Sequence, residues 1–237
     1  MRATDFEFRF RGLIIGAIFW FSFFLYTIDH KNVTQRFVEA MGRGAVSSAA
    51  LAHTVFGIAT VLAAFAALLR TWASALLTKE VVHDLRLHSD RLVADGPYRF
   101  TRNPLYLGTD LLAVAFAPLA SLSGALVMIA AITLFNYRLI LREESQLVKQ
   151  QGKAFQEFCA RVPRLWPALR PRIPVSGRRP DWASGFASES YFWAFAIGEA
   201  WFAVTLNMRA FVIATVVGTA LLVALGWIAA RRNSATA

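Results

Sequence analysis

The chain has 237 residues, of which 57% are hydrophobic and 17% charged, and its mean hydropathy is +0.47. Soluble domains contain about 45–50% apolar and about 25% charged residues, so this composition excludes an ordinary water-soluble enzyme and a disordered chain. The net charge of +10 fits the cytoplasmic excess of Lys and Arg in membrane proteins better than nucleic-acid binding, because we expect no basic run that is interleaved with exposed aromatic residues.

Long uncharged runs predict an all-α membrane protein with about six transmembrane helices. A bilayer core of about 30 Å needs about 20 apolar residues per helix. The run at 104–141 is too long for one span, and Pro118 followed by Ser-Leu-Ser-Gly at 121–124 predicts a turn within it, hence a hairpin of two short helices. The expected spans are 12–28, 44–69, the two halves of 104–141, 190–208 and 210–230.

The distribution of Lys and Arg predicts the orientation of these spans. With six spans, 20 Lys and Arg residues fall on the side of the termini and 4 on the other. Loops rich in Lys and Arg stay in the cytoplasm. We therefore expect both termini and the two polar regions, 70–103 and 142–189, to be cytoplasmic, with the protein in a bacterial inner membrane. The second region is expected to begin as a helix that ends before Pro163.

The end of the first polar region carries the features of an anion-binding corner. Asn103 followed by Pro104 is typical of a helix start, with Asn as the N-cap and Pro at the first helical position. Gly96-Pro97 predicts a tight turn just before it, and Arg99 and Arg102 lie between the two. Free N–H groups at a helix start attract anions. The alternative is a simple cap whose arginines bind lipid phosphates.

Three charged residues lie at the far end of the predicted hairpin, which returns them toward this corner. They are Arg138, Glu143 and Glu144. An arginine inside an apolar run is costly unless it snorkels or pairs, which makes Arg138 a functional candidate. On an ideal helix Arg138 and Glu143 are about 140° apart, so they can line one wide pocket without sharing a face.

Two segments resemble the signatures of the isoprenylcysteine carboxyl methyltransferase and phospholipid methyltransferase superfamily of integral membrane enzymes. The first is Gly-Pro-Tyr-Arg-Phe-Thr-Arg-Asn-Pro-Leu-Tyr-Leu-Gly at 96–108. The second starts at Arg-Glu-Glu, 142–144, and continues with Gly152, Phe155, Phe158, Arg161, Val162, Pro163, Arg164 and Pro167. The resemblance implies S-adenosylmethionine held between a membrane hairpin and a cytoplasmic cap, and a lipophilic acceptor that enters from the bilayer.

The resemblance also implies an organisation and a set of cofactor residues. The core would be 92–179, preceded by N-terminal membrane helices and a loop at 1–91 and followed by a C-terminal pair of helices at 180–237. Asn103 stands where the family often has His, and Asp90 stands where another His is common, with His88 two residues earlier. The residues implied to bind the cofactor are His88, Gly96, Pro97, Tyr98, Arg99, Arg102, Asn103, Pro104, Tyr106, Leu107, Gly108, Glu143 and Glu144.

The methyl acceptor is open between two chemical classes. Arg138 suits a carboxylate, and on that basis we expect carboxyl O-methylation of an isoprenylcysteine-like molecule. Glu143 suits an amine as a general base, which gives phospholipid N-methylation as the alternative. A non-enzymatic transporter or scaffold would instead explain Glu199 within a span, and a nicotinamide-dependent reductase is a further alternative. The four histidines show no metal-ligand spacing, and Cys159 is the single cysteine.

Overall fold

The computed structural model describes residues 1–41, 47–77 and 95–235, which form helices and no strand. The expected all-α class is therefore confirmed for these residues. The α-helices are α1 (Asp5–Arg9), α2 (Arg11–Phe24), α3 (Val33–Met41), α4 (Ser48–Ala75), α6 (Pro104–Phe116), α7 (Leu122–Gln151), α8 (Lys153–Arg161), α9 (Trp182–Thr205) and α10 (Met208–Ala235). Short 3₁₀ turns are η1 (Leu25–Thr27), η2 (Gly96–Arg99) and η3 (Ala117–Leu119).

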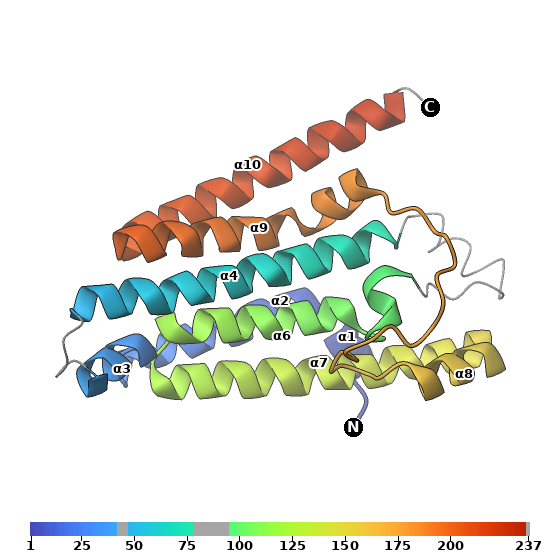
Figure 1. Cartoon of the computed structure of the whole chain (residues 1–237), viewed down its shortest axis with the longest axis horizontal. Helices are drawn as coiled ribbons and strands as arrows, with labels where there is room; N and C mark the ends of the chain where they lie inside the picture. The colour runs from blue at the N-terminus through green and yellow to red at the C-terminus, as the bar shows by residue number, and fades with distance from the viewer. Residues whose placement is uncertain (42–46, 78–94, 236–237) are drawn as a thin grey trace.

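The long helices lie alongside one another as a bundle, with α4 between α6 and α9 and with α10 packed against α9 (Figure 1). Small residues of α4 make these close contacts possible, since Ala63, Ala66 and Ala67 are fully buried in the main core cluster. Phe116 at the end of α6 is the aromatic centre of that cluster. It meets the rings of Phe19, Phe23, Phe195 and Phe211 at centroid distances of 5.5 to 6.4 Å.

Two of the described helices, α4 and α7, are long and apolar enough to cross a membrane. Shorter apolar stretches occupy Arg11–Thr27, Pro104–Leu119 and Met208–Leu222. Six spans thus stay a prediction from the uncharged runs of the sequence.

The predicted turn within 104–141 is confirmed, but the two helices that it joins are unequal. Helix α6 ends at Phe116, η3 contains Pro118, and Ser121 caps α7 by accepting a 3.1 Å hydrogen bond from the Gly124 N–H. The helix predicted from residue 142 is present and ends before Pro163, but in two parts, because α7 continues to Gln151 and α8 (Lys153–Arg161) follows. No Pro or Gly interrupts 125–151, and the helix ends at Gly152, whose φ of 55° suits glycine.

Candidate functional site

A pocket of about 730 Å³ lies between α2, α4, α6, α7 and α9. Its polar lining residues all come from one level of the bundle, near the starts of α2, α6 and α9 and the late parts of α4 and α7. Deeper along the same helices the lining is apolar. The polar residues are Arg11, Arg70, Tyr106, Thr109, Glu143, Glu189 and Tyr191, and the others are Gly12, Ile15, Gly16, Phe19, Leu105, Leu112, Phe192 and Phe195.

Glu143 and Tyr106 are the two predicted site residues that the structure brings together in this pocket. The Tyr106 hydroxyl donates a 2.7 Å hydrogen bond to Glu143 Oε1, which joins the start of α6 to the late part of α7. Both side chains line the pocket. The hydrogen bond fixes one carboxylate oxygen and leaves the other with acceptor capacity, which is the arrangement that a positioned base requires.

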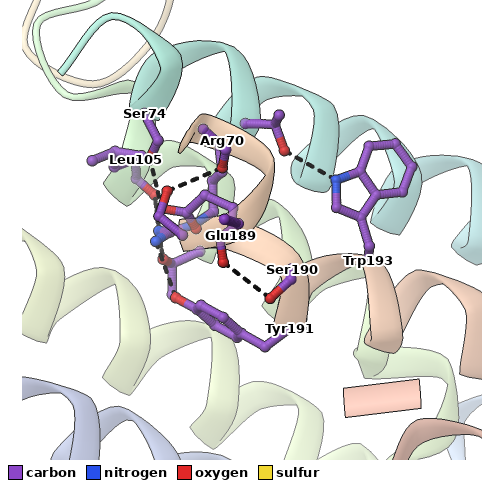
Figure 2. A network of polar contacts seen from close by, with 12 residues as sticks. Arg70, Ser74, Leu105, Glu189, Ser190, Tyr191 and Trp193 are labelled. Atoms are coloured by element: carbon purple, nitrogen blue, oxygen red, sulfur yellow. Dashed lines mark hydrogen bonds and ion pairs between the residues drawn. The ribbon is translucent and has the colours of Figure 1, made fainter. Parts of the chain in front are cut away.

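Arg70, near the end of α4, also lines the pocket and connects α4 to α6 and α9 through hydrogen bonds (Figure 2). Its guanidinium lies 4.2 Å from the centroid of the Phe192 ring and is only slightly exposed. It donates to Glu189 Oε2 (2.7 Å), the Leu105 carbonyl (2.7 Å), Thr109 Oγ1 (2.9 Å) and the Tyr191 hydroxyl (3.2 Å).

Glu189 completes this network from α9. It also accepts a 2.7 Å hydrogen bond from Ser74 Oγ, and its side chain is 7% exposed. A buried charge pair is tolerated only when the remaining hydrogen-bonding capacity is used, as it is here. The network therefore fixes α9 against α4 and α6 at the level of the pocket.

Glu144 belongs to a second polar cluster, because successive residues of a helix point about 100° apart. Arg164 donates to Glu144 Oε2 at 3.0 Å, and Arg102 Nη1 lies 3.1 Å from Glu144 Oε1. The second contact is an ion pair without the alignment of a hydrogen bond. Among the described residues, Glu144 Oε1 and Arg102 Nε are buried without a hydrogen-bond partner. Arg164 also donates to the Tyr137 hydroxyl at 2.7 Å.

The predicted tight turn at Gly96-Pro97 is confirmed as η2, where Gly96 has a φ of 56°. The chain at 163–178 runs along this turn. Arg99 Nε donates to the Ile173 carbonyl, and the Arg102 N–H donates to the Pro163 carbonyl, both at 2.9 Å. Of the two arginines of the predicted anion-binding corner, Arg99 thus contacts a carbonyl of the chain through its side chain, and the Arg102 guanidinium pairs with Glu144.

Asp95, just before the turn, anchors the same segment. Burial raises the pKa of its carboxyl, but hydrogen bonds from the Ser176 hydroxyl and the N–H groups of Ser176 and Arg178 outweigh burial and lower the pKa overall. The carboxylate is therefore charged at neutral pH and holds residues 176–178 against η2.

The predicted helix start at Asn103-Pro104 is confirmed, with α6 beginning at Pro104. The Asn103 side chain does not cap the helix, however. Its amide donates a 2.9 Å hydrogen bond to the Arg164 carbonyl instead. Pro104 and Leu107 are buried, and so is the Tyr98 ring, whose burial raises the pKa of its hydroxyl.

The structure places Arg138 away from the pocket that Glu143 lines. Arg138 Nη2 donates to both carboxylate oxygens of Glu7 in α1, at 2.7 and 2.9 Å. A backbone hydrogen bond from Thr4 and this contact with Arg138 lower the pKa of Glu7 to about 2. Arg138 thereby gains the partner that its position requires, and its observed role is to hold the N-terminal helix.

Two further residues predicted to bind the cofactor, Gly108 and His88, are not among the described residues of the pocket or of the second polar cluster. Gly108 faces α4, and a Cβ there would lie 2.4 Å from Arg70 Cγ, so this glycine makes room for the arginine. His88 lies outside the described residues.

Residues 50–154 match the model of the phospholipid methyltransferase family. The resemblance seen in the two motifs is therefore confirmed. That family belongs to the superfamily of membrane methyltransferases that includes the isoprenylcysteine carboxyl methyltransferases. The matched segment runs from α4 to the start of α8 and contains Arg70, Tyr106, Glu143 and Glu144. Neither the curated proteins nor the solved structures include a match to this chain.

The residues of the second polar cluster fit S-adenosylmethionine, the methyl donor that this family generally uses. The amino-acid part of that molecule carries a carboxylate and an ammonium group, and its ribose carries two hydroxyls. The unpartnered Arg102 Nε is a donor suited to the carboxylate, and Glu144 Oε1 is an acceptor suited to a hydroxyl or the ammonium group. Glu144 follows directly after Glu143, which lines the pocket, along α7.

Sequence reasoning missed the contribution of Arg11, Arg70, Glu189 and Tyr191 to the site. A signal for one pair was present, because Arg70 ends one apolar run and Glu189 precedes another. Two opposite charges at the same predicted membrane level are expected to pair. Span 190–208 was predicted to begin after Glu189, whereas α9 begins at Trp182, capped by Asp181, and so brings Glu189 into the bundle.

Proposed function

We propose that this protein transfers the methyl group of S-adenosylmethionine to the amine of a lipophilic acceptor at the boundary of membrane and cytosol. The observation that carries this proposal is the Glu143–Tyr106 pair at the polar end of an otherwise apolar pocket. A carboxylate at such a place suits a basic nitrogen attached to an apolar body. The family match at 50–154 supports the reaction class.

The chemistry required of the protein is positioning and removal of one proton. S-adenosylmethionine supplies a methyl group made electrophilic by an adjacent sulfonium. Glu143 accepts a hydrogen bond from the acceptor amine, orients its lone pair and takes up the proton lost as the new C–N bond forms and the C–S bond breaks. Tyr106 holds the carboxylate in place through its hydroxyl. The apolar walls exclude water from this end of the pocket.

Carboxyl O-methylation is the second candidate, and Arg11 is the residue that favours it. Arg11 lines the pocket, donates a hydrogen bond from Nη1 to the Phe8 carbonyl, and forms no ion pair among the described residues. A guanidinium without a carboxylate partner can orient a carboxylate with two parallel hydrogen bonds. Arg138, which the sequence favoured for that role, pairs with Glu7. Arg11 is therefore the cation that an O-methylating site would use.

The experiment that separates the two reactions uses purified protein in detergent, S-adenosylmethionine labelled in its methyl group, and a total bacterial lipid extract. We expect label in the lipid phase that alkali does not release as methanol, because N–CH₃ bonds are stable where methyl esters hydrolyse. Label released as methanol by alkali would overturn the amine and support the carboxylate. Incorporation of label no higher than in a protein-free control would contradict both N-methylation and O-methylation.

A further inference from the structure

Most of the apolar lining of the pocket comes from helices outside the family match. Residues 50–154 contribute the polar residues Arg70, Tyr106, Thr109 and Glu143 together with two leucines. Helix α2 contributes Gly12, Ile15, Gly16 and Phe19, and α9 contributes Phe192 and Phe195. The matched segment thus supplies Tyr106 and Glu143 to the polar end. Helices α2 and α9 add Arg11, Glu189 and Tyr191 to that end and contribute most of the apolar walls beyond it.

Two glycines of α2 widen this part of the pocket. A Cβ added at Gly12 or Gly16 would have no atom within 4 Å. A glycine at a close contact between two helices has no such space, since a Cβ at Gly185 would lie 2.6 Å from the Thr71 carbonyl oxygen. Gly12 and Gly16 are one helical turn apart and both line the pocket, so they leave a smooth channel along α2 rather than a seat for another helix.

We propose that the α2–α9 groove, lined by Gly12, Ile15, Gly16, Phe19, Phe192 and Phe195, binds the hydrocarbon chain of the methyl acceptor and selects acceptors by that chain. This inference rests on the proposed function, because it places the reactive amine of the same molecule at Glu143. The polarity gradient supports it. The pocket changes from charged to apolar within about two turns of α2, from Arg11 to Phe19.

The apolar side chains and bare backbone that line the groove favour a flexible hydrocarbon chain as the occupant. Aliphatic and aromatic side chains face a strip of bare helix backbone, and no polar side chain lies beyond the level of Thr109 among the lining residues. A polar ligand placed there would lose its hydrogen bonds to water without replacement. A methylene chain has no hydrogen bonds to water to lose, and its binding removes apolar surface of both the chain and the groove from water.

Photo-crosslinking tests the groove without any need for turnover. The protein is placed in phosphatidylglycerol vesicles that contain a trace of phosphatidylethanolamine bearing a diazirine midway along one acyl chain. The matched probe is phosphatidylcholine with the same modified chain, whose nitrogen has no proton to give. We expect the amine probe to label peptides of α2 and α9 in clear excess over the choline probe, and both probes to label the exposed residues of α10, such as Val212 and Val216, equally.

Variants that narrow the groove supply the second arm. Gly16→Leu should abolish the excess labelling and raise the KM for long-chain acceptors more than for short-chain ones. Gly57→Leu is the matched control, because Gly57 also faces open space but lies outside the pocket. The milder double variant Gly12→Ala/Gly16→Ala favours the helix and guards against misfolding as an explanation.

Equal labelling by the two probes, or excess labelling that Gly16→Leu leaves unchanged, would overturn the proposal and assign the groove to bulk lipid. These outcomes are independent of the methyl-transfer assay. Selective labelling without methyl transfer would retain the groove and reject the reaction, whereas methyl transfer without selective labelling would do the reverse.

Discussion

Glu143 and Glu144 are adjacent in sequence and serve two different clusters. Glu143 accepts a hydrogen bond from the Tyr106 hydroxyl in the pocket, and Glu144 accepts one from Arg164 in the loop after α8. A single step along α7 thus separates the carboxylate that lines the pocket from the carboxylate of the second polar cluster. This division follows from helix geometry, because neighbouring side chains diverge by about 100°.

Tyr106→Phe is expected to lower kcat about tenfold or more, because a hydrogen bond to a charged group contributes about 1.5–3 kcal/mol. The variant keeps the ring and removes only the hydroxyl that positions Glu143. Initial rates of methyl transfer at saturating S-adenosylmethionine provide the measurement, with Tyr26→Phe, outside the pocket, as the control. Unchanged kcat in Tyr106→Phe would show that Glu143 needs no such support.

The hydrogen bonds that the Glu7 carboxylate accepts from the Thr4 N–H and from Arg138 are expected to stabilise the fold at neutral pH and to lose that effect in acid. The pKa of Glu7 is lowered from 4.5 to about 2, so the stabilisation is complete above about pH 5 and declines as pH falls toward 2. Thermal unfolding in detergent checks this. The midpoint difference between the wild type and Glu7→Gln should be constant above about pH 5 and shrink below it. A difference that grows in acid would contradict the assignment.

Sequence reasoning identified several site residues but not all of their partners. The capping pattern of Asn103-Pro104 and the turn at Gly96 are local signals, and both were predicted. The partner of Arg138 is Glu7, 131 positions away, and that of Arg70 is Glu189, 119 positions away. Pairings at such separations depend on how helices pack, and periodicity within one helix carries no information about them.

At the level of elements, the bundle depends on α9 being fixed against α4. Small residues make the contact close, as at Gly185, where a Cβ would meet the backbone of Thr71 and Ala75. The Arg70–Glu189 network makes this packing specific, because it fixes the position of α9 along α4 at the level of Glu189. The sequence predicted a helix in this region but began it eight residues late, since the Asp181 cap lies in a polar stretch that hydropathy assigns to a loop.

Glu189→Leu is expected to lower the free energy of unfolding by about 3–5 kcal/mol, because it leaves Arg70 buried without its counter-charge. Adding Arg70→Met to Glu189→Leu should recover part of that loss, since the unpaired charge is then gone. Unfolding in mixed micelles monitored by tryptophan fluorescence is the measurement, with the exposed Glu157→Leu as the control. A double variant less stable than Glu189→Leu would show that Arg70 contributes mainly through its other contacts.

At the scale of the whole molecule, the long helices place η2, α8 and the N-terminus toward one end of the bundle, and η1 and α3 toward the other (Figure 1). The excess of Lys and Arg falls at the first of these ends. An even number of crossings with both termini in the cytoplasm accounts for this distribution, and it would bring the polar level of the pocket to the cytosolic face of the membrane.

Cysteine accessibility in intact cells tests this topology in a Cys159→Ser background. We expect a cysteine at Lys31, between η1 and α3, to react with a membrane-impermeant maleimide added from outside. A cysteine appended after Ala237 should react only after permeabilisation. Reaction of the appended cysteine in intact cells would contradict the predicted orientation.

The central claim is that Glu143 takes the proton of an amine acceptor during methyl transfer. The most direct measurement is the initial rate of alkali-stable label entering a lipid extract from methyl-labelled S-adenosylmethionine, for the wild type, Glu143→Gln and the exposed control Glu157→Gln. We predict wild-type rates for Glu157→Gln and a loss of about 10²-fold or more for Glu143→Gln that raising the pH does not restore. Undiminished transfer by a folded Glu143→Gln protein would contradict the claim.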